Sequence, residues 1–454
     1  MRHSVASIEK KIGVGAPGVL NLFVKFLQGG LGLGSLFLVG LYLSPVEQGY
    51  FYTFLGLVAL NSFFEMSLGM VIVNTASHYW ARLSLSEVGI IEGSVTAKSN
   101  LNSLYKFVGK WFGIASTLFI FGVGIGGYFY IESGAKEEIA WIAPWFFIIV
   151  VTGLNLVFSG LVAILEGCNR LIQIYSVRGW QTGFALLLTF FALENGLGLW
   201  AASATAMSLL IGNLYIILRH TKFFASLKTA DAQPNFSWQE EILPVQWRYG
   251  VLAVVGYFSF FMITPVIFRF HGAEAAGQIG ITLQLVLGIQ RLAASVLEAK
   301  IPEMGSLASK GNFHHLDSVA KRVGFSTVVL AGLGGLCGFG IVEGLRFYGY
   351  ELGSRFLPTL SLALLMASIV PFIAAHIVGS YFRSFSKVPV FGWLVTNNLL
   401  LLITNIGVGW LYGIQGVSVS YFLIITFFLC PASYLVLKIK RIEIQRNFAK
   451  QNFE

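Results

Sequence analysis

Long apolar runs follow one another along almost the whole chain, and short polar segments separate them. The first two runs occupy residues 19–81 and are joined by a turn at 43–50. Each exceeds the roughly 20 apolar residues that cross a bilayer as a helix. Helix is the expected structure because backbone polar groups inside a bilayer must be satisfied within the segment itself. The pattern predicts twelve spans, near 17–43, 48–78, 111–131, 140–165, 172–193, 197–218, 248–268, 275–299, 323–345, 357–382, 388–411 and 417–437.

A longer polar connection at 219–247 divides the predicted spans into two groups of six. The turns at 44–50 and 272–278 resemble each other, since each brings an acid and a glycine before the next span. They indicate a weak internal repeat, and the alternative is that tight turns look alike by chance. Parallel six-span repeats are a recurrent transporter plan, with the substrate site between the halves.

We therefore predict an all-α polytopic membrane protein with twelve transmembrane helices in two six-helix lobes around a central cavity. The predicted parts are an N-terminal lobe at 1–222, a cytoplasmic linker with an interfacial segment at 223–247, a C-terminal lobe at 248–440 and a cytoplasmic tail at 441–454.

Composition agrees with a membrane protein, because 56% of the 454 residues are hydrophobic and 11% are charged. Soluble globular proteins carry about 25% charged residues. The net charge of +9 raises the question of nucleic-acid binding. The basic residues lie at alternate ends of the apolar runs, however, so we predict a membrane partner and no nucleic-acid partner.

The basic residues also predict the orientation, because Lys and Arg concentrate in cytoplasmic loops. With the N-terminus in the cytoplasm, the inside connections collect most of the 30 basic residues. The outside turns carry Lys136, Arg269, Arg346 and Arg355. We therefore predict that both termini are cytoplasmic.

Three charged residues lie deep within predicted spans: Lys25 in the first, Glu65 in the second and Arg291 in the eighth. A lone charge in a spanning helix costs about 2.5–3.5 kcal/mol on insertion scales, so it usually faces a bundle interior or a wet cavity. Two cations and one carboxylate predict a net positive cavity for an anionic group. The shape of a guanidinium suits phosphate.

Each of these charges shares a helix face with polar or small residues three and four positions away. The first span has the stripe Asn21, Lys25, Gln28, Gly32 and Ser35, and the eighth has Gln284, Gly288, Arg291, Ser295 and Glu298. In the second span, Asn61, Glu65 and Gly69 share a face. The candidate substrate-binding residues are Lys25, Gln28, Asn61, Glu65, Gln284, Arg291 and, in the tenth span, His376.

Structural roles that need no substrate would also explain several of these residues. Lys25 has the reach to snorkel to the inner interface, and Glu65 is also interpretable as a structural ion-pair partner of Lys25. His376 either lines the cavity or satisfies a backbone carbonyl. Four arginines at span ends fit topology or headgroup roles better: Arg178, Arg248, Arg269 and Arg383.

Motifs of enzymes and metal sites are missing from the sequence. It has no Walker A motif, no nucleophile motif and no cluster with metal-ligand spacing. Its three cysteines, Cys168, Cys337 and Cys430, indicate no disulfide framework. We predict a protein that is not an enzyme, with no catalytic residue, no metal and no cofactor.

Three groups of residues carry a family resemblance. They are the turn at 43–50 after a glycine-rich first span, the stretch Phe64-Glu65-Met66-Ser67-Leu68-Gly69 followed by Ser77-His78-Tyr79-Trp80-Ala81, and the segments 243–248, 265–268, 271–274, 276–278 and 300–302 around the seventh and eighth spans. On these residues the chain resembles the Wzx-type polysaccharide (O-antigen) flippases of the multidrug/oligosaccharidyl-lipid/polysaccharide exporter (MOP) superfamily.

The resemblance implies a V-shaped helical bundle in the bacterial inner (plasma) membrane that moves by alternating access. Its substrate would be an undecaprenyl-pyrophosphate-linked oligosaccharide carried from the inner to the outer leaflet during lipopolysaccharide or polysaccharide biosynthesis. Glycan polymerase or assembly proteins would be its partners. In this family, charged residues of spans 1, 2, 7 and 8 line the cavity, and Lys25, Glu65 and Arg291 match that pattern by location.

Three other functions remain open at this stage. A drug or metabolite antiporter of the same superfamily exports amphiphilic cations and would favour a net negative cavity. A membrane-bound polysaccharide polymerase or ligase needs an outside catalytic loop, and every predicted outside connection is short. A passive scaffold for glycan assembly would tolerate loss of the cavity charges.

Overall fold

The computed structural model describes residues 16–86, 89–135, 138–227, 237, 242–385 and 391–451, and nearly all of them are helical. The elements up to residue 132 are α2 (Ala16–Tyr42), α3 (Pro45–Val58), α4 (Asn61–Glu65), α5 (Leu68–Trp80), β1 (Leu83–Leu85), β2 (Ile91–Gly93), α6 (Val95–Leu118), η1 (Phe119–Val123) and α7 (Gly124–Glu132). The next are α8 (Ile142–Gly167), α9 (Leu171–Glu194), η2 (Gly198–Ser203), α10 (Ala204–Arg219) and α11 (Thr221–Leu227).

The elements after residue 242 are α13 (Leu243–Phe260), α14 (Ile263–His271), α15 (Ala273–Glu298), α16 (Ile301–Ser309), α17 (Phe313–Phe347), α18 (Glu351–Ser354), α19 (Thr359–Ala367), α20 (Ile369–Arg383), α21 (Phe391–Leu423), η3 (Ile424–Leu429) and α22 (Cys430–Gln451). Most of the predicted linker at 223–247 lies outside the described residues, as does the end of the predicted tail at 441–454.

The spans agree with the apolar runs of the sequence. In the described part of the chain, ten helical segments are long and apolar enough to cross a membrane. One of them, Phe391–Ile444, is 54 residues long and changes direction at Gly413 (φ 60°, ψ −145°), so it supplies two spans. α9 adds another 24-residue helix, whose polar positions lower its hydropathy. The prediction of an all-α polytopic fold with twelve spans is confirmed.

Two helices begin well before the apolar runs that predicted them. α6 starts at Val95 and α17 at Phe313, where Ser94 accepts a hydrogen bond from the backbone N–H of Ala97 and Asn312 accepts one from His315. Such caps stabilise the free N–H groups of a first helical turn. The added turns are amphipathic, with buried residues at spacings of three and four. Hydropathy alone therefore placed these starts too late.

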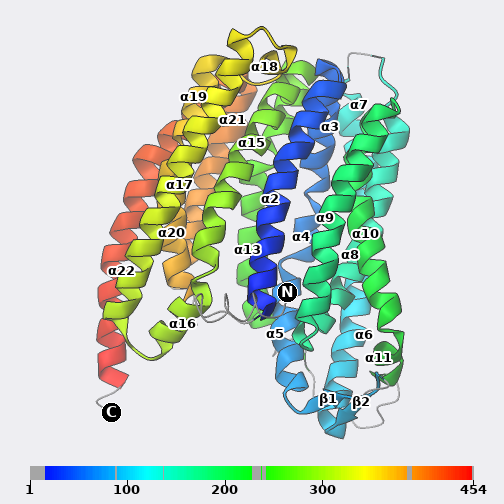
Figure 1. Ribbon diagram of the computed structural model, residues 1–454, viewed down its shortest axis with the longest axis vertical. Coiled ribbons are helices and arrows are strands. Elements are labelled where there is room, and N and C mark those ends of the chain that lie inside the picture. The colour runs from blue at the N-terminus through cyan, green and yellow to red at the C-terminus, as the bar shows by residue number, and fades with distance from the viewer. Residues whose placement is uncertain are drawn as a thin grey trace. The chain divides into compact units, whose positions relative to one another are not determined.

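The chain divides by its contacts into two compact units, drawn as ribbons in Figure 1. Unit 1 comprises Met1–Tyr52 and Val266–Glu454, and unit 2 comprises Thr53–Pro265. The predicted lobes at 1–222 and 248–440 follow the order of the spans instead. By contacts, α2 belongs with the C-terminal segments and α13 with the N-terminal ones.

Unit 2 is built around α8, against which α5, α6 and α10 pack. The indole of Trp145 is fully buried and donates a hydrogen bond from Nε1 to the carbonyl oxygen of Gly124 (2.9 Å). A short antiparallel hairpin of β1 and β2 joins α5 to α6. Small residues let the helix backbones approach, as is common in membrane bundles.

Gly160 of α8 offers a stability test of this packing. A Cβ at Gly160 would lie 2.5 Å from Cδ2 of Phe112, which is fully buried. We expect Gly160→Ala to destabilise the protein by about 1–3 kcal/mol through overpacking, measured by thermal unfolding in detergent. The control is Gly183→Ala on α9, where an added Cβ meets nothing within 4 Å. Equal melting temperatures for the two variants would contradict this packing.

Candidate substrate-binding face on α2 and α15

The helices α2 and α15 of unit 1 pack antiparallel along most of their length. A Cβ on Gly29 would contact Leu292, one on Gly288 would contact Leu33, and one on Gly40 would contact Ile281. These contacts define the register, in which positions near 25 of α2 lie beside positions near 298 of α15. The predicted polar stripes of the first and eighth spans therefore lie on neighbouring helices.

An ion pair joins the two stripes. The Lys25 Nζ donates a hydrogen bond to Oε2 of Glu298, and the two side chains are 42% and 32% exposed. The sequence left open a pairing of Lys25 with Glu65, whereas the partner in the structure is Glu298. Because each member of the pair belongs to its helix's polar stripe, the two stripes meet at this ion pair. The two stripes together are called the α2–α15 face here.

The helix α15 buries one side and leaves the predicted stripe open. Its buried positions include Leu285, Ile289 and Leu297, whereas Arg291 is exposed and Gln284 is partly exposed. Arg291 lies seven residues before Glu298, about 10 Å along the helix at 1.5 Å per residue. Among the described residues, no carboxylate lies within ion-pair distance of its guanidinium.

On α2, the stripe is open as well. Lys25, Gln28 and Gly32 are exposed, and Ser35 is partly exposed and donates a hydrogen bond to the carbonyl oxygen of Gly32 (2.8 Å). Gln28 follows Lys25 by one helical turn and is therefore on the same side of α2. Among the side chains that the structure describes, the α2–α15 face thus carries two cations, one carboxylate and two amides, and its formal charge is positive.

His376 of α20 contacts two side chains of its own helix. An η-nitrogen of Arg383 lies 3.4 Å from Nε2 of His376, and the ring of Phe372 stacks on the imidazole with centroids 6.5 Å apart. The carboxylate of Glu298 acts electrostatically on the same imidazole. His376 therefore lies near the Lys25–Glu298 pair. Arg383, which the sequence favours as a topology residue, contacts both His376 and Ser380.

Asn61 and Glu65 belong to unit 2, where Glu65 ends the short helix α4. The two residues after it, Met66 and Ser67, have left-handed backbone conformations (φ 48° and 56°) before α5 begins. Non-glycine residues rarely adopt this conformation, and such strained positions concentrate at functional sites. The second span is therefore broken at Glu65, within the membrane-spanning length.

A second group of charges lies within electrostatic range of Glu65. Arg178 of α9 acts electrostatically on its carboxylate, and the Arg178 guanidinium lies 3.4 Å from Oε2 of Glu166 on α8. Tyr175 donates a hydrogen bond to the other Glu166 oxygen (3.2 Å). Glu65 also folds toward the first turn of α5, since a Cβ on Gly69 would lie 3.0 Å from its Oε1. With two carboxylates and one guanidinium, this cluster has a formal charge of −1.

Five of the seven predicted site residues thus lie in unit 1, namely Lys25, Gln28, Gln284, Arg291 and His376. That Glu65 shares a cavity with them stays a prediction. Sequence reasoning did not select Glu166 as a site residue and favoured a topology or headgroup role for Arg178, although the tight turn at 168–170 makes their helices α8 and α9 neighbours. It placed Glu298 on the polar stripe without selecting it as a site residue.

Comparisons with known proteins were made at the level of sequence and of structure. No family model and no curated protein matches the sequence. Among solved structures, an inward-facing multidrug resistance MATE family transporter of the MOP superfamily matches with a TM-score of 0.64 and 14% identity. The match covers 94% of this chain and 99% of that one.

Two further structures match with a TM-score of 0.60. One is a MOP superfamily transporter from Pyrococcus furiosus, described as having a binding pocket of reverse polarity that suggests a different function; it is 15% identical and covers 94% of this chain and 96% of that chain. The other is a mutant of the Vibrio cholerae MATE transporter VcmN, 14% identical, covering 98% and 99%. The chain therefore has, over nearly its whole length, the fold of the MATE transporters of the MOP superfamily.

Proposed function

We propose that this protein is a transporter that works by alternating access, and that it moves an undecaprenyl-pyrophosphate-linked oligosaccharide across the bacterial inner membrane. The observation that carries the proposal is Arg291, an exposed arginine inside a spanning helix with no carboxylate partner in the described chain. Intramembrane charges of this kind usually mark substrate or ion pathways.

The composition of the α2–α15 face supports an anionic substrate group. Lys25 and Glu298 neutralise each other, so Arg291 is left as an uncompensated positive charge about 10 Å deeper along α15. A guanidinium has the planar donor geometry that fits two phosphate oxygens at once. In this proposal, Arg291 binds the pyrophosphate, and the amides of Gln28, which is exposed, and Gln284, which is partly exposed, contact sugar hydroxyls.

The fold supports the transport mode of the proposal. Solved structures with this fold are described as inward-facing and as outward-facing MATE transporters. Parallel transporter halves that rock about a central site produce such pairs of states. The same proposal places the protein in the inner membrane with both termini in the cytoplasm. It also expects glycan polymerase or assembly proteins as partners.

A second candidate is a drug or metabolite antiporter, and one cluster favours it. The group of Glu65, Glu166 and Arg178 carries a formal charge of −1, which suits a proton or an organic cation. Among the solved structures with this fold, one is described as a multidrug resistance transporter. The Pyrococcus furiosus structure is described by a pocket of reverse polarity. Pocket charge is therefore the property that separates the two candidates.

Proteoliposomes distinguish them directly. We expect purified protein to move a fluorescent undecaprenyl-pyrophosphate oligosaccharide between leaflets, as detected with a membrane-impermeant quencher, and not to move a fluorescent lipophilic cation. Protein-free liposomes are the control. The antiporter would be the better assignment if the protein moved the cation and not the glycolipid. Cation movement should then be lost in Glu65→Gln and kept in Arg291→Gln.

A further inference from the structure

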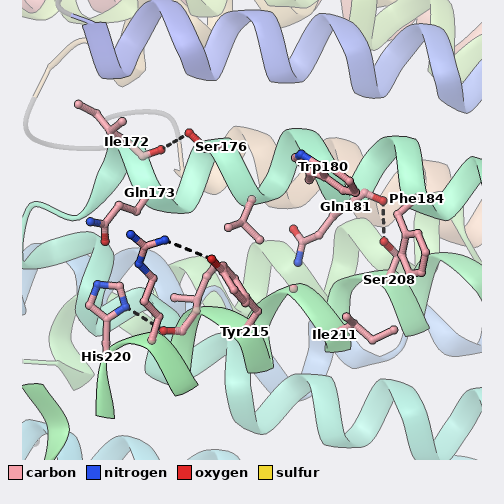
Figure 2. Close-up of a pocket in the computed structure, with 14 residues that line it drawn as sticks. Ile172, Gln173, Ser176, Trp180, Gln181, Phe184, Ser208, Ile211, Tyr215 and His220 are labelled. Carbon is pink, nitrogen blue, oxygen red and sulfur yellow. Dashed lines mark hydrogen bonds between the residues drawn. The ribbon is translucent and has the colours of Figure 1, made fainter. Parts of the chain in front are cut away.

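A groove of about 640 Å³ runs along α9 and α10 in unit 2. None of the residues that line it belongs to the α2–α15 face. Figure 2 shows Gln173, Tyr215 and His220 near one another toward one end of the groove. The opposite end, beyond Trp180, holds Phe184 and Ile211. Ser208 also lies toward this end, where its hydroxyl donates to the carbonyl oxygen of Gln181 (2.6 Å). The groove thus has a basic end, and the opposite end is lined by large apolar side chains beside one satisfied hydroxyl.

The end that holds Gln173, Tyr215 and His220 is basic. Arg219 is exposed at the last turn of α10 and donates a hydrogen bond from Nη1 to the hydroxyl oxygen of Tyr215 (3.1 Å). His220 follows it, with Nδ1 2.8 Å from the carbonyl oxygen of Ile216. None of the residues that line the groove is an aspartate or a glutamate. An anion at this end would therefore meet the Arg219 guanidinium without a competing carboxylate.

Two side-chain acceptors in the groove lack donors. The amide oxygens of Gln173 and Gln181 are buried and have no hydrogen-bond partner in the described chain. Leaving a buried polar atom unpaired costs about 1–3 kcal/mol. Gln181 is held in place by donating to the carbonyl oxygen of Leu209 (3.1 Å). The Gln173 oxygen is covered by protein atoms in this structure, so a hydroxyl or ammonium group of a ligand reaches it only after the side chain rotates into the groove.

The apolar part of the groove has the length of one leaflet. From Gln173 to Phe184 the helix rises about 16 Å, roughly half of the 30 Å hydrocarbon core of a bilayer. Trp180, at the middle of this path, is 80% exposed, so its indole offers a large uncovered apolar surface. An extended acyl chain fits a groove of this length and character.

We propose that this groove binds one anionic phospholipid, and that phosphatidylglycerol is preferred. The phosphate lies against Arg219 and Tyr215, a glycerol hydroxyl donates to the amide oxygen of Gln173, and one acyl chain lies along Trp180 and Phe184. Phosphatidylcholine has no headgroup donor for Gln173, and phosphatidylethanolamine has a donor but no net charge. None of the residues that line the groove is among those assigned to the transport site above.

Native mass spectrometry of the full-length protein in vesicle-derived nanodiscs tests the proposal. With equal amounts of phosphatidylglycerol, phosphatidylethanolamine and phosphatidylcholine, we expect one retained phosphatidylglycerol per protein. Arg219→Gln should weaken its retention on the order of tenfold, the effect of losing one charge-assisted hydrogen bond. Lys222→Gln, which removes an exposed cation three residues later and outside the groove lining, should leave retention unchanged.

A second pair of variants tests the apolar path without changing charge. Ser176→Phe fills the groove, whereas Ser326→Phe changes an equally exposed serine on α17 that bonds to its own helix in the same way. Loss of phosphatidylglycerol in the first variant alone supports the site. Equal retention in wild type, Arg219→Gln and Ser176→Phe, or equal retention of all three lipids, would overturn it, whatever the transport assays give.

Discussion

Replacing Arg291 with glutamine is expected to reduce transport of the lipid-linked oligosaccharide by on the order of tenfold to a hundredfold. Glutamine keeps a comparable length and two N–H donors but removes the positive charge. A hydrogen bond to a charged group contributes about 1.5–3 kcal/mol, and each 1.4 kcal/mol is a factor of ten. Because Arg291 is exposed and has no carboxylate partner in the described chain, its loss should leave folding intact.

The measurement is the rate of glycolipid movement in proteoliposomes, together with surface polysaccharide in cells that depend on this protein. The matched control is Arg322→Gln, an exposed arginine on α17 outside the predicted span at 323–345. Both variants should insert and melt like wild type. A transport rate for Arg291→Gln equal to that of Arg322→Gln would remove the proposed phosphate contact.

The Lys25–Glu298 pair is expected to show charge complementarity. Lys25→Glu or Glu298→Lys alone places two like charges side by side on the α2–α15 face, and we expect each to reduce transport about tenfold or more. The double variant restores opposite charges between α2 and α15. It should recover a large part of the activity, because the pair joins helices that are 273 positions apart in the chain.

A double-mutant cycle on the transport rate and on the melting temperature measures this coupling. Exposed surface ion pairs contribute only about 0–1 kcal/mol in water, so a pair in a fully hydrated surface location would show little coupling. Losses in the single variants that simply add in the double variant would indicate that Lys25 and Glu298 act independently. That result would favour snorkelling of Lys25 over a paired role.

The spans and the polar stripe of α15 were predictable because both depend on short-range periodicity. Apolar runs long enough for a bilayer correspond to the helices, and Gln284 and Arg291 lie on the side of α15 that packing leaves open, while Leu285 and Ile289 lie on the buried side. The length of the apolar runs therefore predicted the elements, and the three-and-four spacing of neighbours on a helix predicted one face of the candidate site.

The contacts that complete the site were not predictable in the same way. The partner of Lys25 is set by how α2 packs on α15, and no local pattern distinguishes Glu298 from Glu65 as that partner. The break after Glu65 places Met66 and Ser67 at positive φ, where sequence reasoning expects glycine or asparagine. The assignment of α2 to unit 1 also depends on long-range packing.

Water access to the α2–α15 face is most directly measured by cysteine labelling. In a protein whose own cysteines are replaced, Gln28→Cys and Gln284→Cys should react rapidly with a charged, membrane-impermeant thiol reagent, and added lipid-linked oligosaccharide should slow both reactions. Leu330→Cys, an exposed apolar position on α17, should stay unlabelled. Labelling of positions 28 and 284 as slow as that of 330 would mean that this face meets lipid, and the proposed binding of phosphate by Arg291 would be wrong.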